Sequence, residues 1–109
     1  MALEISKKTD YGEQVQAVYW TIIHSAFNWY DKQATVHLAG FHSEEAYKAR
    51  AKCLTVVKFD FHADHVTFPY GTSNVTVQLL FPFTRSGNNI QAAYKAITSL
   101  ELWQAAKEI

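Results

Sequence analysis

The chain has 109 residues, of which 49% are hydrophobic and 15% aromatic, and this composition indicates one folded domain, residues 1–109, rather than a disordered chain. Ten basic and ten acidic side chains cancel, so the chain lacks the excess positive charge that binding to nucleic acid requires. Cys53 is the only cysteine, which excludes an intramolecular disulfide and a zinc site built from several thiolates.

The apolar segments are too short for a membrane span. Polar residues such as His24, Asn28 and Gln78 interrupt them before they reach the roughly 20 residues that a spanning helix needs. The opening segment, Met1 to Lys8, is too short and too polar for a signal peptide. We therefore expect a soluble protein with no membrane partner, whose zero net charge permits association between copies.

The first part of the chain predicts strands. Residues 2–6 alternate between apolar and polar and suit a short strand, and residues 7–12 suit a polar turn. Residues 13–30 are rich in β-branched and aromatic side chains, and both of their period-two faces are apolar, which predicts a central or bent strand covered on both sides. One predicted face carries Val15, Ala17, Tyr19, Thr21, Ile23, Ser25, Phe27 and Trp29, and the other carries Val18, Trp20, Ile22, His24, Ala26 and Asn28.

A hairpin and a short helix are expected next. A tight turn at Asp31-Lys32 leads into a return strand over residues 33–42, whose second face is expected to meet solvent or a partner. Ser43 can cap a helix over residues 43–52, because acidic residues follow it in the first turn and Glu44 stands four residues before Lys48.

The remaining chain predicts three further strands and a final helix. Residues 54–61, 65–70 and 74–83 are strand-like, and Pro69 and Pro82 place their ends at edges or turns. Asn88 followed by Gln91 resembles a capping box, and the helix after it has an apolar pattern at helical spacing formed by Ile90, Ala93, Tyr94 and Ile97. Residues 98–101 suit a new cap or kink. The predicted class is α+β: an antiparallel sheet or sandwich-like domain with a short inserted helix and a C-terminal helix packed on the sheet.

The segment His62-Ala63-Asp64-His65 is the strongest candidate for a metal site. Imidazole and carboxylate suit zinc or manganese, and a turn could bring the groups together. Successive side chains of an extended chain point to opposite faces, however, so Asp64 and His65 would not easily share one ion. We expect an ordinary polar turn and assign no metal ligand, cofactor-binding residue or cofactor.

Other reactive side chains form no recognisable site. His24, His37 and His42 fall on neighbouring predicted strands, where they are either ordinary sheet histidines or a pH-sensitive cluster. Cys53 is expected to be a small buried hydrophobic residue. The serines lack the Gly-x-Ser-x-Gly pattern of a nucleophile elbow, so no catalytic residue is assigned and the chain is expected not to be an enzyme.

Aromatic side chains are the unusual feature of the composition. The chain has three Trp, six Tyr and seven Phe. Core packing is expected to account for most of them, but one core of this size should not easily absorb them all. Some should therefore lie at a protein interface, where aromatic residues are enriched. The candidate contact residues are aromatic residues expected on the solvent side near the hairpin, such as Trp29, Tyr30 and Phe41.

Three segments resemble small accessory proteins encoded with the tail and structural genes of tailed bacteriophages. They are Met1–Thr9 with Tyr11-Gly12 leading to Tyr19-Trp20, then Val36–Ala46 with its Ser-x-Glu-Ala turn, and Ala92–Leu100 with its Tyr-x-x-Ile-x-x-Leu spacing. The resemblance implies a virion structural protein, repeated by symmetry in a tail, baseplate or neck and assembled in the bacterial host cytoplasm. It concerns scaffold positions, so it implies no functional residue.

The leading expectation is therefore a non-enzymatic phage structural or assembly protein that contacts itself and other virion proteins. One alternative is a small-molecule or glycan-binding module, with aromatic strands lining a pocket and His62, Asp64 and His65 at its mouth. Another is a phage-encoded inhibitor of host defence, since such proteins are also small.

Overall fold

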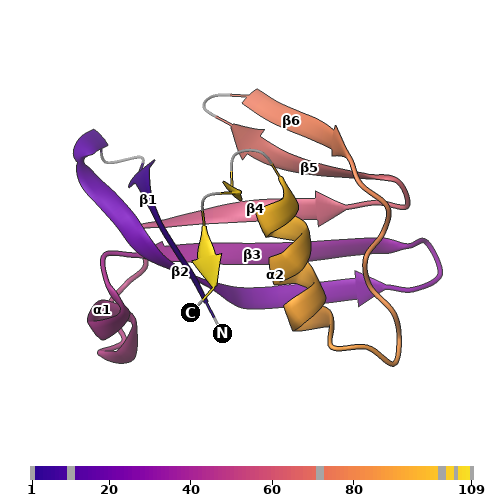
Figure 1. Ribbon diagram of the computed structural model, residues 1–109, viewed down its shortest axis with the longest axis horizontal. Coiled ribbons are helices and arrows are strands. Elements are labelled where there is room, and N and C mark those ends of the chain that lie inside the picture. The colour runs from indigo at the N-terminus through magenta and orange to yellow at the C-terminus, as the bar shows by residue number, and fades with distance from the viewer. Residues whose placement is uncertain (1, 10–11, 71–72, 101–102, 105, 109) are drawn as a thin grey trace.

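The computed structural model describes residues 2–9, 12–70, 73–100, 103–104 and 106–108. Its strands form one antiparallel sheet in the order β6-β5-β4-β3-β2-β1-β7, and two helices accompany it (Figure 1). The elements are β1 (Leu3–Thr9), β2 (Gly12–Asn28), β3 (Gln33–Phe41), α1 (Glu44–Lys48), β4 (Thr55–Phe61), β5 (His65–Tyr70), β6 (Ser73–Gln78), α2 (Asn89–Ser99) and β7 (Lys107–Glu108). The predicted α+β class is confirmed, with a single sheet over the described residues.

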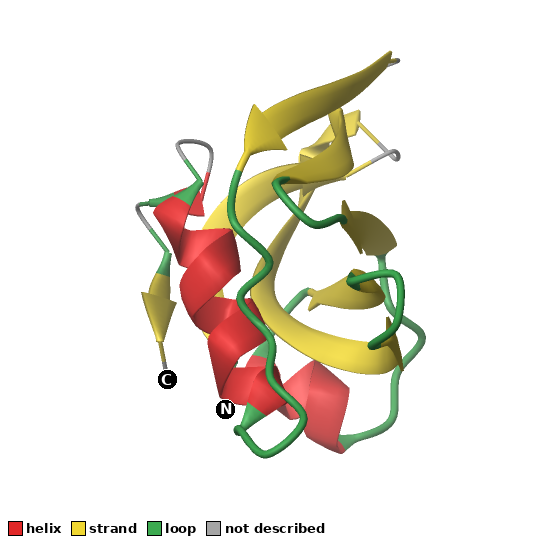
Figure 2. Ribbon diagram, turned by 90° about the vertical axis from the view of Figure 1, so that its right-hand side faces the viewer, coloured by secondary structure: helices red, strands yellow, loops and turns green. Residues whose placement is uncertain are grey.

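Strand β2 connects the two halves of the sheet. It is 17 residues long; its first part pairs with β1 and its second with β3, and Tyr19 and Trp20 pair with both neighbours. The β2–β3 register shifts between Ile22 and His24, and such a bulge bends a strand and increases its twist. The sheet accordingly curves around α2 (Figure 2).

This bulge overturns the period-two assignment for residues 13–30. Trp20 lies in the core with 1% of its surface exposed, whereas Ile23, on the other predicted face, is 51% exposed. Phe27, from the same predicted face as Ile23, nonetheless packs against the core. The extra residue in β2 exchanges the two faces beyond it, so the prediction of two uniform faces was wrong.

Helix α2 covers one face of the sheet, which we call the inner face (Figure 1). Asn88 caps it, since its side-chain oxygen accepts a hydrogen bond from the backbone N–H of Gln91 at 3.1 Å, as the capping-box pattern predicts. The helix buries Ala93, Tyr94, Ala96 and Ile97 against inner-face residues of the sheet, chiefly Val36, Leu38, Phe59, Phe61, Val66 and Phe68. The expected packing of the C-terminal helix on the sheet is therefore observed.

Strand β6 and the chain end differ from the predicted boundaries. β6 ends at Gln78 instead of continuing to Phe83. Beyond it, Leu79 and Phe81 donate to carbonyls of the turn between β4 and β5 instead of to a strand, and the chain then passes Pro82 on its way to α2. The predicted new cap or kink falls partly on Glu101, which lies outside the described residues. Just beyond it, Trp103 is buried and its ring meets the Trp20 ring edge-on, with centroids 5.1 Å apart.

The core absorbs most of the aromatic side chains of the described residues, as expected, and leaves some of them partly or fully exposed. Eight of those described are buried, namely Trp20, Phe41, Phe59, Phe61, Phe68, Phe83, Tyr94 and Trp103. Edge-to-face contacts such as those of Phe61 and Phe83 let large rings pack densely. The exposed aromatic residues in the described chain are Tyr30 and Tyr47.

Candidate functional site

The sheet face opposite α2, which we call the outer face, carries most of the polar side chains of the central strands. His24 of β2 lies opposite His37 of β3, and His37 lies opposite Lys58 of β4. Residues opposite one another on antiparallel strands share a face. The outer face therefore presents two imidazoles and an ammonium group in one line across three strands.

The histidine cluster predicted from the sequence forms only in part. The rings of His24 and His37 lie with their centroids 5.0 Å apart. His42 follows the end of β3 and is exposed, and its ring is not stacked on either of the other two among the described ring contacts. The sheet pairing thus brings two of the three residues together.

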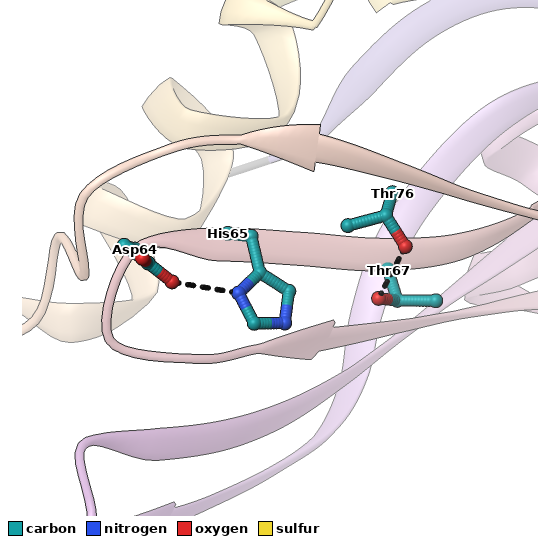
Figure 3. Close-up of polar contacts among 4 residues, drawn as sticks. All are labelled: Asp64, His65, Thr67 and Thr76. Carbon is teal, nitrogen blue, oxygen red and sulfur yellow. Dashed lines mark hydrogen bonds and ion pairs between the residues drawn. The ribbon is translucent and has the colours of Figure 1, made fainter.

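A second line of polar residues crosses the outer face from β3 to β6, and we call it the threonine row: Thr35, Asp60, Thr67 and Thr76. Each member lies opposite the next in the strand register. The Thr35 hydroxyl donates to the Asp60 carboxylate at 3.3 Å, and the hydroxyls of Thr67 and Thr76 share a hydrogen bond of 3.1 Å (Figure 3). These two bonds hold the side chains of the threonine row, which ends at Thr76 on the edge strand β6.

The His62–His65 segment forms the turn between β4 and β5. The rings of His62 and His65 stack with centroids 4.4 Å apart and planes 17° apart. Asp64 Oδ1 lies 2.7 Å from His65 Nδ1 (Figure 3), so the turn brings together two successive side chains that an extended chain would point to opposite faces. Within the described residues, no group of three His, Cys, Asp or Glu side chains is arranged to hold a metal ion.

Asp64 should titrate below its ordinary range. The hydrogen bond from His65 stabilises the carboxylate and lowers the pKa of Asp64. This contribution to folding is present above the ordinary carboxyl pKa and fades as the pH falls through the lowered value. In an NMR titration, His65→Ala should return the Asp64 pKa to the ordinary range. His62→Ala, which keeps the bonded partner, should change the Asp64 pKa much less; an unchanged Asp64 pKa in His65→Ala would contradict the assignment.

Helix α1 borders a small hollow at the other end of the outer face. Ser43 caps the helix through a 3.1 Å bond from the Ala46 N–H. The Tyr47 ring packs against Phe41, 5.1 Å away, and against Tyr19, 5.3 Å away. Burial, with a smaller contribution from the nearby Glu44 carboxylate, raises the pKa of Tyr19.

The hollow combines aromatic and basic groups. It has a volume of about 340 Å³ and is lined by Phe41, Tyr47, Lys48, Arg50 and Ala51. Lys48 is paired with Glu44 at 3.1 Å, and Arg50 adopts the left-handed conformation with φ of 59°, which is uncommon for a residue other than glycine. The sequence pattern identified the cap but not this hollow, since Phe41 and Arg50 line one hollow only because of the turn that α1 makes.

Comparison with known proteins gives no relative for this chain. No protein-family model, no curated protein and no solved structure matches it. Among the described helices, none has the length and apolar character needed to cross a membrane.

The predicted contact residues have different surroundings. Tyr30 is 94% exposed. Trp29 is half-buried, stacked on Phe27 at 5.2 Å, and Phe41 is buried. The assignment of Phe41 to the solvent side was wrong, because α1 covers the end of the face on which it lies. Cys53 is half-buried rather than fully buried as expected.

Proposed function

We propose that this chain is a non-enzymatic structural or assembly component of a bacteriophage particle, placed in a tail, baseplate or neck. It acts through contacts with copies of itself and with other virion proteins. The bacteriophage setting rests on the resemblance of the three sequence segments described above.

The observation that supports a role in protein–protein contacts is the exposure of several large apolar side chains. Tyr30 is 94% exposed, Leu80 79% and Ile23 51%. Large apolar side chains in water favour contacts that remove them from it. Because the formal net charge is zero, electrostatic repulsion between copies is weak.

The protein content of purified particles tests the proposal. Quantitative mass spectrometry of particles from the phage that carries this sequence should find the chain in a fixed ratio to the major tail or head protein. Washing the particles at high salt should leave that ratio unchanged, whereas a host protein that co-purifies by chance should decrease. If the washed particles lack the chain, it is not a component of them.

A second candidate function is binding of a small anionic ligand with a ring system, and the hollow beside α1 favours it. Tyr47 offers a ring face, Arg50 offers a guanidinium group, and the volume of about 340 Å³ lies within the size range of small-molecule sites. A thermal-shift screen of sugar phosphates and nucleotides tests it, because a ligand that binds the native state raises the melting temperature. Arg50→Ala should abolish any such shift; a shift that persists in Arg50→Ala would place the ligand elsewhere.

A further inference from the structure

Strand β6 forms one lateral edge of the sheet, and no described residue pairs with its outer side (Figure 1). All six of its residues pair with β5 in an unbroken register, from His65 opposite Gln78 to Tyr70 opposite Ser73. A regular edge strand exposes backbone N–H and C=O groups in a row, which is a template for another strand.

The backbone of β6 shows which of its groups face outward. In an antiparallel pair, hydrogen-bonded and non-hydrogen-bonded positions alternate. Pro69 has no N–H and lies opposite Asn74, so this pair takes a non-hydrogen-bonded position. Beyond the strand, the N–H groups of Leu79 and Phe81 donate to the carbonyls of Asp64 and Ala63 at 2.9 and 3.0 Å. The backbone N–H and C=O groups of odd-numbered residues therefore point toward β5. The backbone groups of Asn74, Thr76 and Gln78 therefore point away from β5.

The opposite edge of the sheet is protected, whereas the β6 edge is not. At the opposite edge, β7 pairs with Leu3 and Glu4 of β1. The β1–β2 register is irregular at two places, and Lys7 and Lys8 follow in the sequence. Charged residues and bulges are the usual means of preventing edge-to-edge pairing. The sequence of β6, Ser-Asn-Val-Thr-Val-Gln, has no charge and no proline, and the exposed Leu80 follows it.

We propose that two copies of this chain join through β6, antiparallel about a two-fold axis that passes beside Thr76, to form one continuous sheet. This inference rests on the proposed function, in which the chain contacts copies of itself. Thr76 then lies opposite its counterpart, Asn74 opposite Gln78 of the second copy, and Val75 opposite Val77 of the second copy. The outward N–H and C=O groups of Asn74, Thr76 and Gln78 in one copy then pair with those of the same residues in the other copy, giving about six hydrogen bonds between the copies.

A second copy fits this edge better than an unrelated peptide does, because in this register inner-face residues of β6 lie opposite inner-face residues and outer-face residues lie opposite outer-face residues. The half-buried Val75 and Val77 continue the inner face across the axis, and the exposed Asn74, Thr76 and Gln78 continue the outer face. The threonine row then runs unbroken through both copies. Since the other edge is protected, the assembly closes as a dimer instead of growing into a fibre.

A charge at the axis tests the pairing. Thr76→Lys places two ammonium groups opposite each other and should raise the dimer dissociation constant by more than about tenfold. Thr67→Lys is the matched control: it adds the same charge on the same face and removes the same Thr67–Thr76 hydrogen bond, but one strand inside the edge. Sedimentation velocity should show Thr67→Lys dimerising like the wild type and Thr76→Lys remaining a monomer, with circular dichroism checking that both are folded.

Cross-linking gives a second test that does not depend on a destabilised variant. In a Cys53→Ser background, Thr76→Cys should form a disulfide-linked dimer under mild oxidation, because directly opposite Cα atoms lie about 5.5 Å apart. Asn74→Cys should not form this disulfide, because the cysteine at position 74 of the second copy would lie roughly 13 Å farther along the strand. Efficient cross-linking of Asn74→Cys alone would overturn this register.

The outcomes separate this inference from the function on which it rests. If the wild type associates and Thr76→Lys associates equally well, pairing through β6 is wrong and the contact role still stands. If the wild type is a monomer and neither cysteine variant cross-links, the inference is overturned, while the particle composition decides the proposed function by itself.

Discussion

Replacing Trp20 by alanine is expected to lower the free energy of unfolding by about 3–5 kcal/mol. The side chain is 1% exposed, its indole N–H donates to the Ile5 carbonyl at 2.9 Å, and its ring meets Trp103 edge-on. It lies where β2 pairs with both β1 and β3, so the cavity opens at the junction of the sheet. Urea unfolding followed by circular dichroism measures the change; a loss below about 1 kcal/mol would contradict this packing.

Gly40 provides the matched test of the Trp20 contact. A Cβ at position 40 would lie 2.7 Å from the Trp20 ring and 2.8 Å from the Ala17 Cβ, closer than side chains approach. Gly40→Ala should therefore destabilise the wild type by about 1–3 kcal/mol. In the Trp20→Ala background it should cost clearly less, because one of the two clashes is gone. Equal costs in both backgrounds would mean that the ring does not lie over Gly40.

Removing the Tyr94 hydroxyl is expected to lower the free energy of unfolding by about 1–3 kcal/mol. Tyr94 is buried in α2, and its hydroxyl oxygen accepts a hydrogen bond from the Ile22 N–H at 2.9 Å. Ile22 stands at the bulge of β2, where the regular ladder to β3 is interrupted. In Tyr94→Phe, this N–H loses its partner, and an unsatisfied donor away from water is costly. Urea unfolding and amide hydrogen exchange at Ile22 both measure the effect.

Thr21→Val is the control for this prediction. It removes the 3.2 Å hydrogen bond between the hydroxyls of Thr21 and Tyr94 while the bond from the Ile22 N–H stays, and valine has nearly the same shape as threonine. We expect a loss of less than about 1 kcal/mol. If Thr21→Val destabilises the chain as much as Tyr94→Phe does, the bulge is not held by the tyrosine hydroxyl.

Local patterns predicted most elements of this fold but not all of their bounds, since β1 continues to Thr9 into the turn expected over residues 7–12 and α1 ends at Lys48. Ser43 and Asn88 cap the two helices as their sequences suggest, because a cap depends on residues that are near one another along the chain. Strand β5 matches its predicted range, residues 65–70. The final helix buries Ala93, Tyr94 and Ile97 because their spacing places them on one side, whereas Ile90, the fourth residue of the predicted apolar pattern, is 41% exposed.

The period of β2 could not be predicted, since the bulge arises from tertiary packing. Nothing in residues 13–30 marks Ile23 as the point where the faces exchange. The bulge becomes favourable only when Tyr94, more than seventy positions away, supplies a partner for the freed N–H. Which aromatic residues fill the core could not be predicted for the same reason: rings such as Phe61 and Phe83 come together from distant segments.

The candidate surfaces were predictable only in part. Alternation placed His24 and His37 on adjacent strands, and they do meet. The meeting of Asp64 and His65 required the turn geometry, which the segment alone does not specify. That β6 lies at an edge follows from the strand order, which no local pattern encodes.

Light scattering of the wild-type chain over a concentration series tests most directly whether its surface works through contact with other copies. We expect the molar mass to rise from 12.4 kDa to twice this value as concentration increases, and 0.5 M salt to change the midpoint little because β6 carries no charge. A mass that stays at 12.4 kDa up to millimolar concentration would contradict this contact role.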